Sequence, residues 1–147
     1  MAESVFLVFG EEIDRERFVD LVVSLGGVTG PGERGEARLS DGYAHVWVHL
    51  TGLAENEPDE LAVYQARLGG PVMTEIELEI SRTKGSEQLA FRIIEAVARH
   101  WWFVVFNGRD EPEVGVRTVD ELRARAGAGA HGIFWPSGAD GRADSNG

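Results

Sequence analysis

The strongest constraint on the fold comes from two alternating segments on either side of Asp41-Gly42. This dipeptide between alternating residues predicts a β-hairpin closed by a two-residue type I′ turn, with Leu39 opposite Ala44. Successive strand residues point to opposite faces, so the hairpin should bury one of its faces. The apolar face contains Ala37, Leu39, Ala44, Val46, Val48 and Leu50, and the polar face contains Glu36, Arg38, Tyr43, His45, Trp47 and His49.

Two further segments predict strands. Residues 72–81 alternate strictly, which is typical of a half-buried strand. Residues 101–106 are apolar in both alternations and predict a strand covered on both faces, closed by the turn residues Asn107-Gly108. In the first of these strands, Val72, Ile76, Leu78 and Ile80 should face the core, with Thr74 among them, while Glu75, Glu77 and Glu79 should face solvent.

Helical spacing of apolar residues predicts four helices. A short apolar strand at 4–9 precedes the first helix, which stops at Gly26-Gly27, and the second begins at Pro58. The third follows the turn at 83–86, and Thr118-Val119-Asp120-Glu121 is a capping box that opens the fourth. The apolar residues that define the first and third helices are Ile13, Phe18, Leu21, Val22, Leu25, Leu89, Ala90, Ile93, Ile94 and Val97.

The order of these elements predicts an α+β fold with an antiparallel or mixed sheet and helices packed on one face. Two βαβ-like halves with a hairpin between them indicate a ferredoxin-like or related βαββ(α)βαβα sandwich. Residues 1–136 are expected to form one domain, with 133–135 docking on it, and 137–147 a disordered C-terminal tail.

Charge and composition exclude several classes of function. The 25 acidic and 14 basic residues give a net charge of −11, which opposes binding to nucleic acid. The chain has no cysteine, so thiolate metal sites and cysteine nucleophiles are absent. Neither a signal peptide nor a membrane span is visible, so we expect a cytoplasmic protein. All basic residues except Lys84 are arginine, a bias that indicates a bacterial genome rich in G and C.

His45 and His49 are the first candidates for a site, since they share a strand face with Tyr43 and Trp47. Four residues along a strand span roughly 13 Å, whereas two ligands of one zinc ion lie within about 4 Å of each other. We therefore expect no metal at this pair and no other cofactor, although one histidine could join a carboxylate from a neighbouring strand.

The row Glu75, Glu77 and Glu79 is the second candidate. Its carboxylates should lie roughly 7 Å apart, a spacing compatible with acid–base chemistry. Such chemistry also needs a cleft that raises the pKa of one carboxyl, and a flat solvated face provides none. Residues 51–79 contain seven acids against Arg67 alone, a net charge of −6. An acidic surface with aromatic side chains is suited either to solubility or to capturing a basic partner.

Two functional hypotheses follow. The first is a non-enzymatic protein-binding module, an acidic inhibitor or immunity-type protein that masks a basic partner with Glu75, Glu77, Glu79, Tyr43, His45, Trp47 and His49. The second is a small-molecule or metal-binding protein or enzyme with a pocket on the sheet face near His45 and His49. No phosphate-binding loop or nucleophile elbow is present, so binding without catalysis is favoured. A rim of Trp101, Phe134 and Trp135 could also form a homodimer contact.

Overall fold

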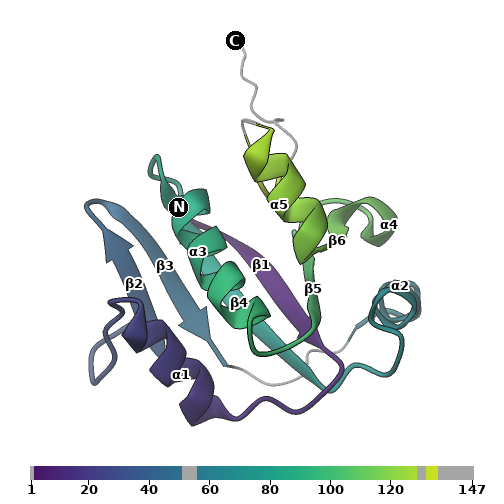
Figure 1. Ribbon diagram of the computed structural model, residues 1–147, viewed down its shortest axis with the longest axis horizontal. Helices are drawn as coiled ribbons and strands as arrows, with labels where there is room; N and C mark the ends of the chain where they lie inside the picture. The colour runs from purple at the N-terminus through teal and green to yellow at the C-terminus, as the bar shows by residue number, and fades with distance from the viewer. Residues whose placement is uncertain (1, 51–55, 129–131, 136–147) are drawn as a thin grey trace.

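A single antiparallel sheet organises the described residues, which are 2–50, 56–128 and 132–135 of this computed structural model (Figure 1). Its strands lie in the order β2-β3-β4-β1-β5-β6. The strands are β1 (Ala2–Phe9), β2 (Ala37–Asp41), β3 (Ala44–His49), β4 (Thr74–Ser81), β5 (Phe103–Phe106) and β6 (Val116–Thr118). The helices are α1 (Arg15–Ser24), α2 (Pro58–Leu68), α3 (Ser86–Ala98), α4 (Pro112–Gly115) and α5 (Val119–Gly127). The predicted α+β fold is confirmed.

The strand order refines the predicted topology. All neighbouring strands are antiparallel, so β4 and β5 run in the same direction on either side of β1. Helix α3 connects them, which makes β4-α3-β5 a split βαβ unit. The first half differs from the predicted βαβ pattern because β2 and β3 form a hairpin that adds to the far side of β4, leaving β2 antiparallel to β1.

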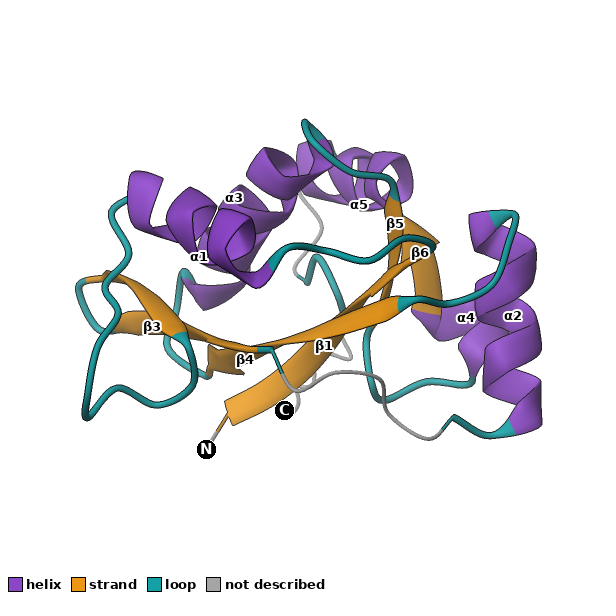
Figure 2. Cartoon of the chain, turned by 90° about the horizontal axis from the view of Figure 1, so that it is seen from below, coloured by secondary structure: helices purple, strands orange, loops and turns teal. Residues whose placement is uncertain are grey.

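The helices cover the two faces of the sheet unequally. Helices α1, α3 and α5 lie together on one face, while α2 and α4 pack on the opposite face at the β5 and β6 end (Figure 2). All four residues of β5 are buried, as predicted for a strand covered on both faces, but the strand is shorter than the predicted 101–106, because Trp101 and Trp102 precede it and Trp102 is 52% exposed. The face of β2, β3 and β4 that points away from α1 and α3 carries none of the described helices, and we call it the outer face.

The hairpin has the predicted faces but a different turn. Its turn residues are Gly42 and Tyr43 rather than Asp41 and Gly42, and Leu39 pairs with Val46, two residues further along than expected. Gly42 has a φ of 63° and Tyr43 lies outside the positive region. A type I′ turn needs positive φ at both positions, so it is excluded, and this pattern is that of type II′. The shift is even, so every side chain keeps its predicted face.

The C-terminal part of the chain is anchored as predicted by its capping box and apolar segment. The Thr118 side chain accepts from the Glu121 backbone N–H, and the Glu121 side chain accepts from the Thr118 backbone N–H. Ile133, Phe134 and Trp135 are buried. The latter two rings therefore do not form the exposed rim proposed for a homodimer. The predicted tail, 137–147, lies outside the described residues.

Candidate functional site

The outer face of β3 carries the aromatic and histidine residues predicted for the site. Tyr43 is 85% exposed at the tip of the hairpin, while His45, Trp47 and His49 are half-buried. Segment 28–36 covers part of this face in place of a helix, and its Arg34 guanidinium lies 4.3 Å from the centre of the Trp47 ring. A guanidinium over an indole ring is a favourable cation–π contact. The segment therefore brings a cation to the centre of the predicted site.

The two histidines have separate partners. His45 Nδ1 lies 2.7 Å from Ser40 Oγ, and His49 Nε2 lies 2.9 Å from Glu79 Oε1. An ionised carboxylate only accepts, so His49 donates from Nε2. Neither histidine lies beneath α2, which packs at the other end of the sheet. Within the described residues, no three His, Asp or Glu side chains are grouped as a metal site would require.

The predicted row of glutamates does not form an open acidic surface. Glu79 pairs with Arg34 at 2.9 Å as well as with His49, and Glu77 accepts from Ser4 Oγ at 2.5 Å. Both carboxylates are half-buried on the outer face. Their charge is thus shared with neighbours on the same face rather than presented to a partner.

Glu75 corrects the sequence interpretation, because it is buried and only 6% exposed. Its backbone pairs with Val8, which lies in the smaller core beneath Tyr64 of α2. The carboxylate accepts from Asn56 Nδ2 at 2.6 Å. Alternation sets the direction of a side chain, but α2 covers the sheet at this position, so Glu75 faces protein instead of solvent.

Tyr64 of α2 is a buried titratable group in the smaller core. Burial raises the pKa of its phenol, and the negative charges of Glu60 and Glu75 raise it further. The side chain is 2% exposed, so ionisation would place a charge in the smaller core. The phenol therefore remains protonated in the folded state well above the pH at which it ionises in the unfolded chain.

Stability should consequently fall at high pH in a way that depends on Tyr64. The folded-state pKa is raised, so this group's stabilising contribution is full below about pH 10, the unfolded value, and is lost as the pH rises above it. Tyr64→Phe keeps the ring and removes the titration. We expect the urea midpoint of the wild type to fall relative to that of Tyr64→Phe between pH 9 and 11. If the midpoints of the two proteins change with pH in the same way, the phenol of Tyr64 is not buried with a raised pKa.

An open groove lies beside Trp47 on the outer face, where β1 begins and β4 ends. Its volume is about 440 Å³. We call it the arginine groove, and its lining residues are Ala2, Arg34, Trp47, Ser81, Arg82 and Thr83. The indole and two guanidinium side chains thus come from three separate segments, namely β3, segment 28–36 and the end of β4.

A smaller pocket lies at the opposite end of β1 and β4, where Phe9 pairs with Thr74. Its volume is about 170 Å³. We call it the end pocket, and it is lined by Ile13, Arg15, Phe18, Leu50, Met73, Thr74, Glu75 and Ile76. Thr74 Oγ1 accepts from the Ile13 backbone N–H and donates to the Glu11 carbonyl, and these bonds hold the β1–α1 connection against the start of β4.

Carboxylates that form no ion pair among the described residues lie next in sequence to Ile13, one of the lining residues of the end pocket. Glu11, Glu12 and Asp14 flank Ile13 and are exposed. Within the described part of the chain, none of the three forms an ion pair, although the Asp14 side chain caps α1 by accepting from backbone N–H groups. Arg15 is the cation nearest in sequence, and it pairs with Glu36 at 3.4 Å. The segment that supplies Ile13 to the pocket thus carries three acidic residues, while the lining itself contains one cation and one carboxylate, Arg15 and Glu75.

The protein is an α+β protein with a six-stranded antiparallel sheet, and its surface has a groove at one end of β1 and β4 and a pocket at the other. No family model, curated protein or solved structure matches the chain. None of the helices in the described residues has the length and apolar character needed to cross a membrane. Function must therefore be argued from the residues of this chain.

Sequence patterns missed most of the residues that line the two hollows. Arg34 lies in a glycine-rich segment whose path over Trp47 has no local signal, and Arg82 lies in a turn. Ile13 and Phe18 were recognised as apolar helix-stripe residues, but a stripe does not reveal a gap in packing. The acidic residues Glu11, Glu12 and Asp14 are visible in the sequence, but no pattern in it places them next to a hollow.

Proposed function

We propose that the protein is a non-enzymatic, cytoplasmic binding module that masks a basic protein partner, as an inhibitor or immunity-type protein does. The observation that carries this proposal is the end pocket, an apolar hollow lined by Ile13, whose exposed neighbours Glu11, Glu12 and Asp14 form no ion pair within the described residues. The proposed docking surface therefore moves from the glutamate row of β4 to the end of the sheet where β4 begins.

The pocket combines the two features that strong protein interfaces use. Its walls of Phe18, Leu50 and Ile76 give room for one large apolar side chain of a partner, which would be an anchor desolvated on binding. Glu11 and Glu12, close to Ile13 in sequence, would attract a basic partner and raise the association rate. Met73 is 41% exposed and offers an adaptable apolar contact at the same place.

The test compares two double charge reversals. Glu11→Lys with Glu12→Lys changes the charge beside Ile13 of the end pocket, and Glu111→Lys with Glu113→Lys makes the same change in charge near α4. The tagged wild-type protein should retain one basic protein from host lysate, at a ratio of one partner molecule per tagged molecule. The purified pair should bind at least tenfold more weakly when the first double variant is used, and increasing salt should weaken wild-type binding.

Either of two results would overturn the proposal. The first is that wild type retains no stoichiometric basic protein at low salt. The second is that both double variants lose the same amount of affinity, because binding would then depend on net charge alone. The matched change near α4 separates a local docking surface from general electrostatic attraction.

A second candidate function, a small-molecule binder with a pocket on the sheet face, is favoured by one observation. The arginine groove opens beside Trp47, on the face that also carries His45 and His49. Its lining differs from the predicted one, because arginines and hydroxyl-bearing residues replace the two histidines.

A further inference from the structure

We propose that the arginine groove binds a small organic anion, with an oxyanion group held between Arg34 and Arg82 and a planar apolar part placed against Trp47. Phosphate and carboxylate groups share the chemistry required, since each accepts several hydrogen bonds and carries negative charge. This proposal goes beyond the basic partner and does not depend on it.

The groove and the end pocket are separate sites. The groove lies where Ala2 pairs with Ser81, and the pocket lies where Phe9 pairs with Thr74, seven residues away along β4. This corresponds to roughly 23 Å along the strand. The groove also opens on the outer face, whereas Phe18 and Ile76 of the pocket belong to the core beneath α1 and α3. Variants of one site therefore leave the other unchanged.

Each arginine of the groove keeps donors for a ligand. Arg34 uses Nη1 to bind Glu79, and Arg82 uses Nη2 to bind Glu3. A guanidinium has five N–H donors in a planar fork, so each side chain has further donors free. The two side chains are 56% and 59% exposed. A dissolved anion can therefore reach both.

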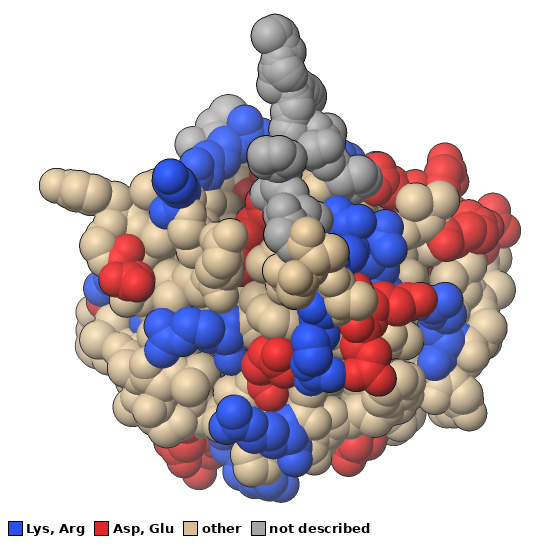
Figure 3. Space-filling model, turned by 45° about the horizontal axis from the view of Figure 1, so that its top comes forward, with Lys and Arg blue, Asp and Glu red and all other residues tan. Residues whose placement is uncertain are grey.

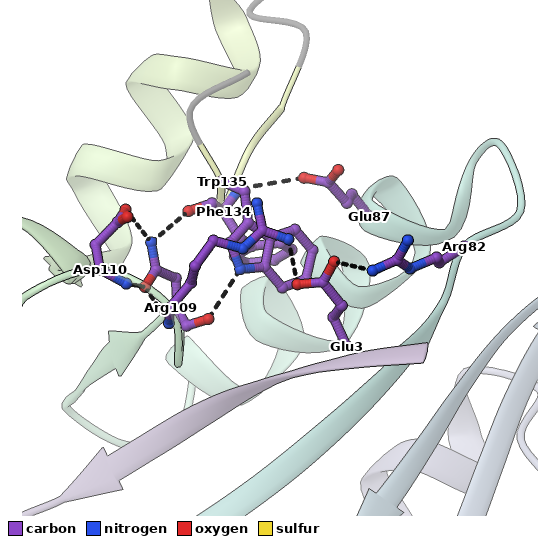
Figure 4. Close-up of polar contacts among 8 residues, drawn as sticks. Glu3, Arg82, Glu87, Arg109, Asp110, Phe134 and Trp135 are labelled. Atoms are coloured by element: carbon purple, nitrogen blue, oxygen red, sulfur yellow. Dashed lines mark hydrogen bonds and ion pairs between the residues drawn. The ribbon is translucent and has the colours of Figure 1, made fainter. Parts of the chain in front are cut away.

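The carboxylates next to the groove are shared among more cations than they can neutralise. Glu79 accepts from His49 as well as from Arg34. Glu3 lies between Arg82 and Arg109 and pairs with both of them (Figure 4). Each carboxylate carries one negative charge, so the three arginines together exceed the two glutamates by one positive charge.

The surroundings of the groove contrast with the net charge of the whole chain. Lys84 is exposed in the turn that follows Arg82 and adds a further positive charge. Figure 3 shows the side of the molecule that carries α1, α3 and α5, where lysine and arginine groups are interspersed with acidic ones; the groove opens on the opposite, outer face. In a chain with a net charge of −11, the lining of the groove contains two arginines and no acidic residue, which favours an anion there.

Trp47 gives the groove its preference for a planar ligand. The indole contacts the Arg34 guanidinium, 4.3 Å from its centre, and also the His45 ring, whose centre is 5.6 Å away. These contacts hold the indole on the outer face, where it lines the groove. A flat apolar group can contact this side chain while its anionic end reaches the arginines.

The test uses isothermal titration calorimetry with four probes: AMP, adenosine, inorganic phosphate and benzoate. AMP has a planar group and a phosphate, and benzoate has a planar group and a carboxylate. Adenosine lacks the anion, and phosphate lacks the planar group. We expect saturable binding of AMP, benzoate or both, each tighter than adenosine or inorganic phosphate. The tighter of the two identifies the oxyanion.

The variants give effects of opposite sign. Arg34→Gln and Arg82→Gln should each weaken binding of the tighter probe by about tenfold or more, since each removes a charged donor. Glu79→Gln should strengthen it, because Arg34 is released from its carboxylate. Arg92→Gln is the matched control, an exposed arginine of α3 outside the groove, and should change nothing. If the Arg34–Glu79 pair only maintained the shape of the groove, Arg34→Gln and Glu79→Gln would both weaken binding.

Three results would overturn the proposal. They are no saturable binding of AMP or benzoate up to about 10 mM, binding no tighter than that of adenosine and inorganic phosphate, and binding that Arg34→Gln and Arg82→Gln leave unchanged. The last would place the anion elsewhere on the chain. A failure of the end pocket to capture a basic protein would not affect any of these outcomes, because the probes are added to the purified protein.

Discussion

Replacing Phe134 with alanine is expected to lower the free energy of unfolding by about 3 to 5 kcal/mol. The side chain is 1% exposed and belongs to the main core, although it lies beyond the last helix. Its ring contacts that of Trp135 edge to face, with the ring centres 5.8 Å apart. Alanine would leave a cavity where the surrounding strands and helices cannot close in.

The segment that carries Phe134 is held rigidly enough for this cavity to persist. The Glu87 carboxylate accepts from the backbone N–H of Phe134 (Figure 4) and from that of Ile133. The Asn107 side chain donates to the Phe134 carbonyl. Trp135 Nε1 donates to the Asn107 carbonyl at 2.8 Å. These bonds fix the backbone on both sides of the ring, so relaxation into the cavity is restricted.

Urea denaturation followed by circular dichroism measures the effect. Tyr43→Ala is the matched control, since it removes an aromatic ring of similar size that is 85% exposed. The control should shift the free energy by less than about 0.5 kcal/mol. A Phe134→Ala variant as stable as the control would show that residues 132–135 are not docked on the core in solution.

The elements that local patterns specify were predicted well. Val46 and Val48 face the core and Trp47 faces outward, as alternation requires. The hairpin turn at Gly42 and Tyr43 shifts the strand pairing by two residues from the predicted one. The predicted inner and outer faces are unchanged, because a side chain changes face only when the pairing shifts by an odd number of residues. Thr118 and Glu121 formed the expected capping box because all of its contacts lie within four residues.

The candidate site was predicted less well, because it depends on contacts between distant segments. Glu75 was expected to be exposed, and it is buried since α2 covers that position of the sheet. Glu79 was expected to face solvent, with one histidine able to join a carboxylate from a neighbouring strand. The structure pairs Glu79 with His49, as that expectation allowed, and also with Arg34, 45 residues away in sequence. Periodicity describes one element at a time, so it could not reveal which element covers another.

Replacing Gly35 with alanine is expected to lower the free energy of unfolding by about 2 to 4 kcal/mol. Gly35 has a φ of +73°, a region that residues with a Cβ adopt at a cost. A Cβ there would also lie 2.4 Å from the Val48 carbonyl oxygen and 2.9 Å from His49 Nδ1. The first of these atoms belongs to the backbone of a central hairpin strand, so segment 28–36 must move instead.

Gly32→Ala in the same segment separates backbone strain from the clash. Gly32 has a φ of +89°, but no atom lies within 4 Å of a Cβ placed there, so we expect a cost of about 1 to 2 kcal/mol. The larger loss at Gly35 should be accompanied by weaker anion binding, because movement of the segment withdraws Arg34 from Trp47. Equal losses of stability at the two glycines would mean that segment 28–36 does not pack against β3, and the arginine groove would then lose one of its two guanidinium groups.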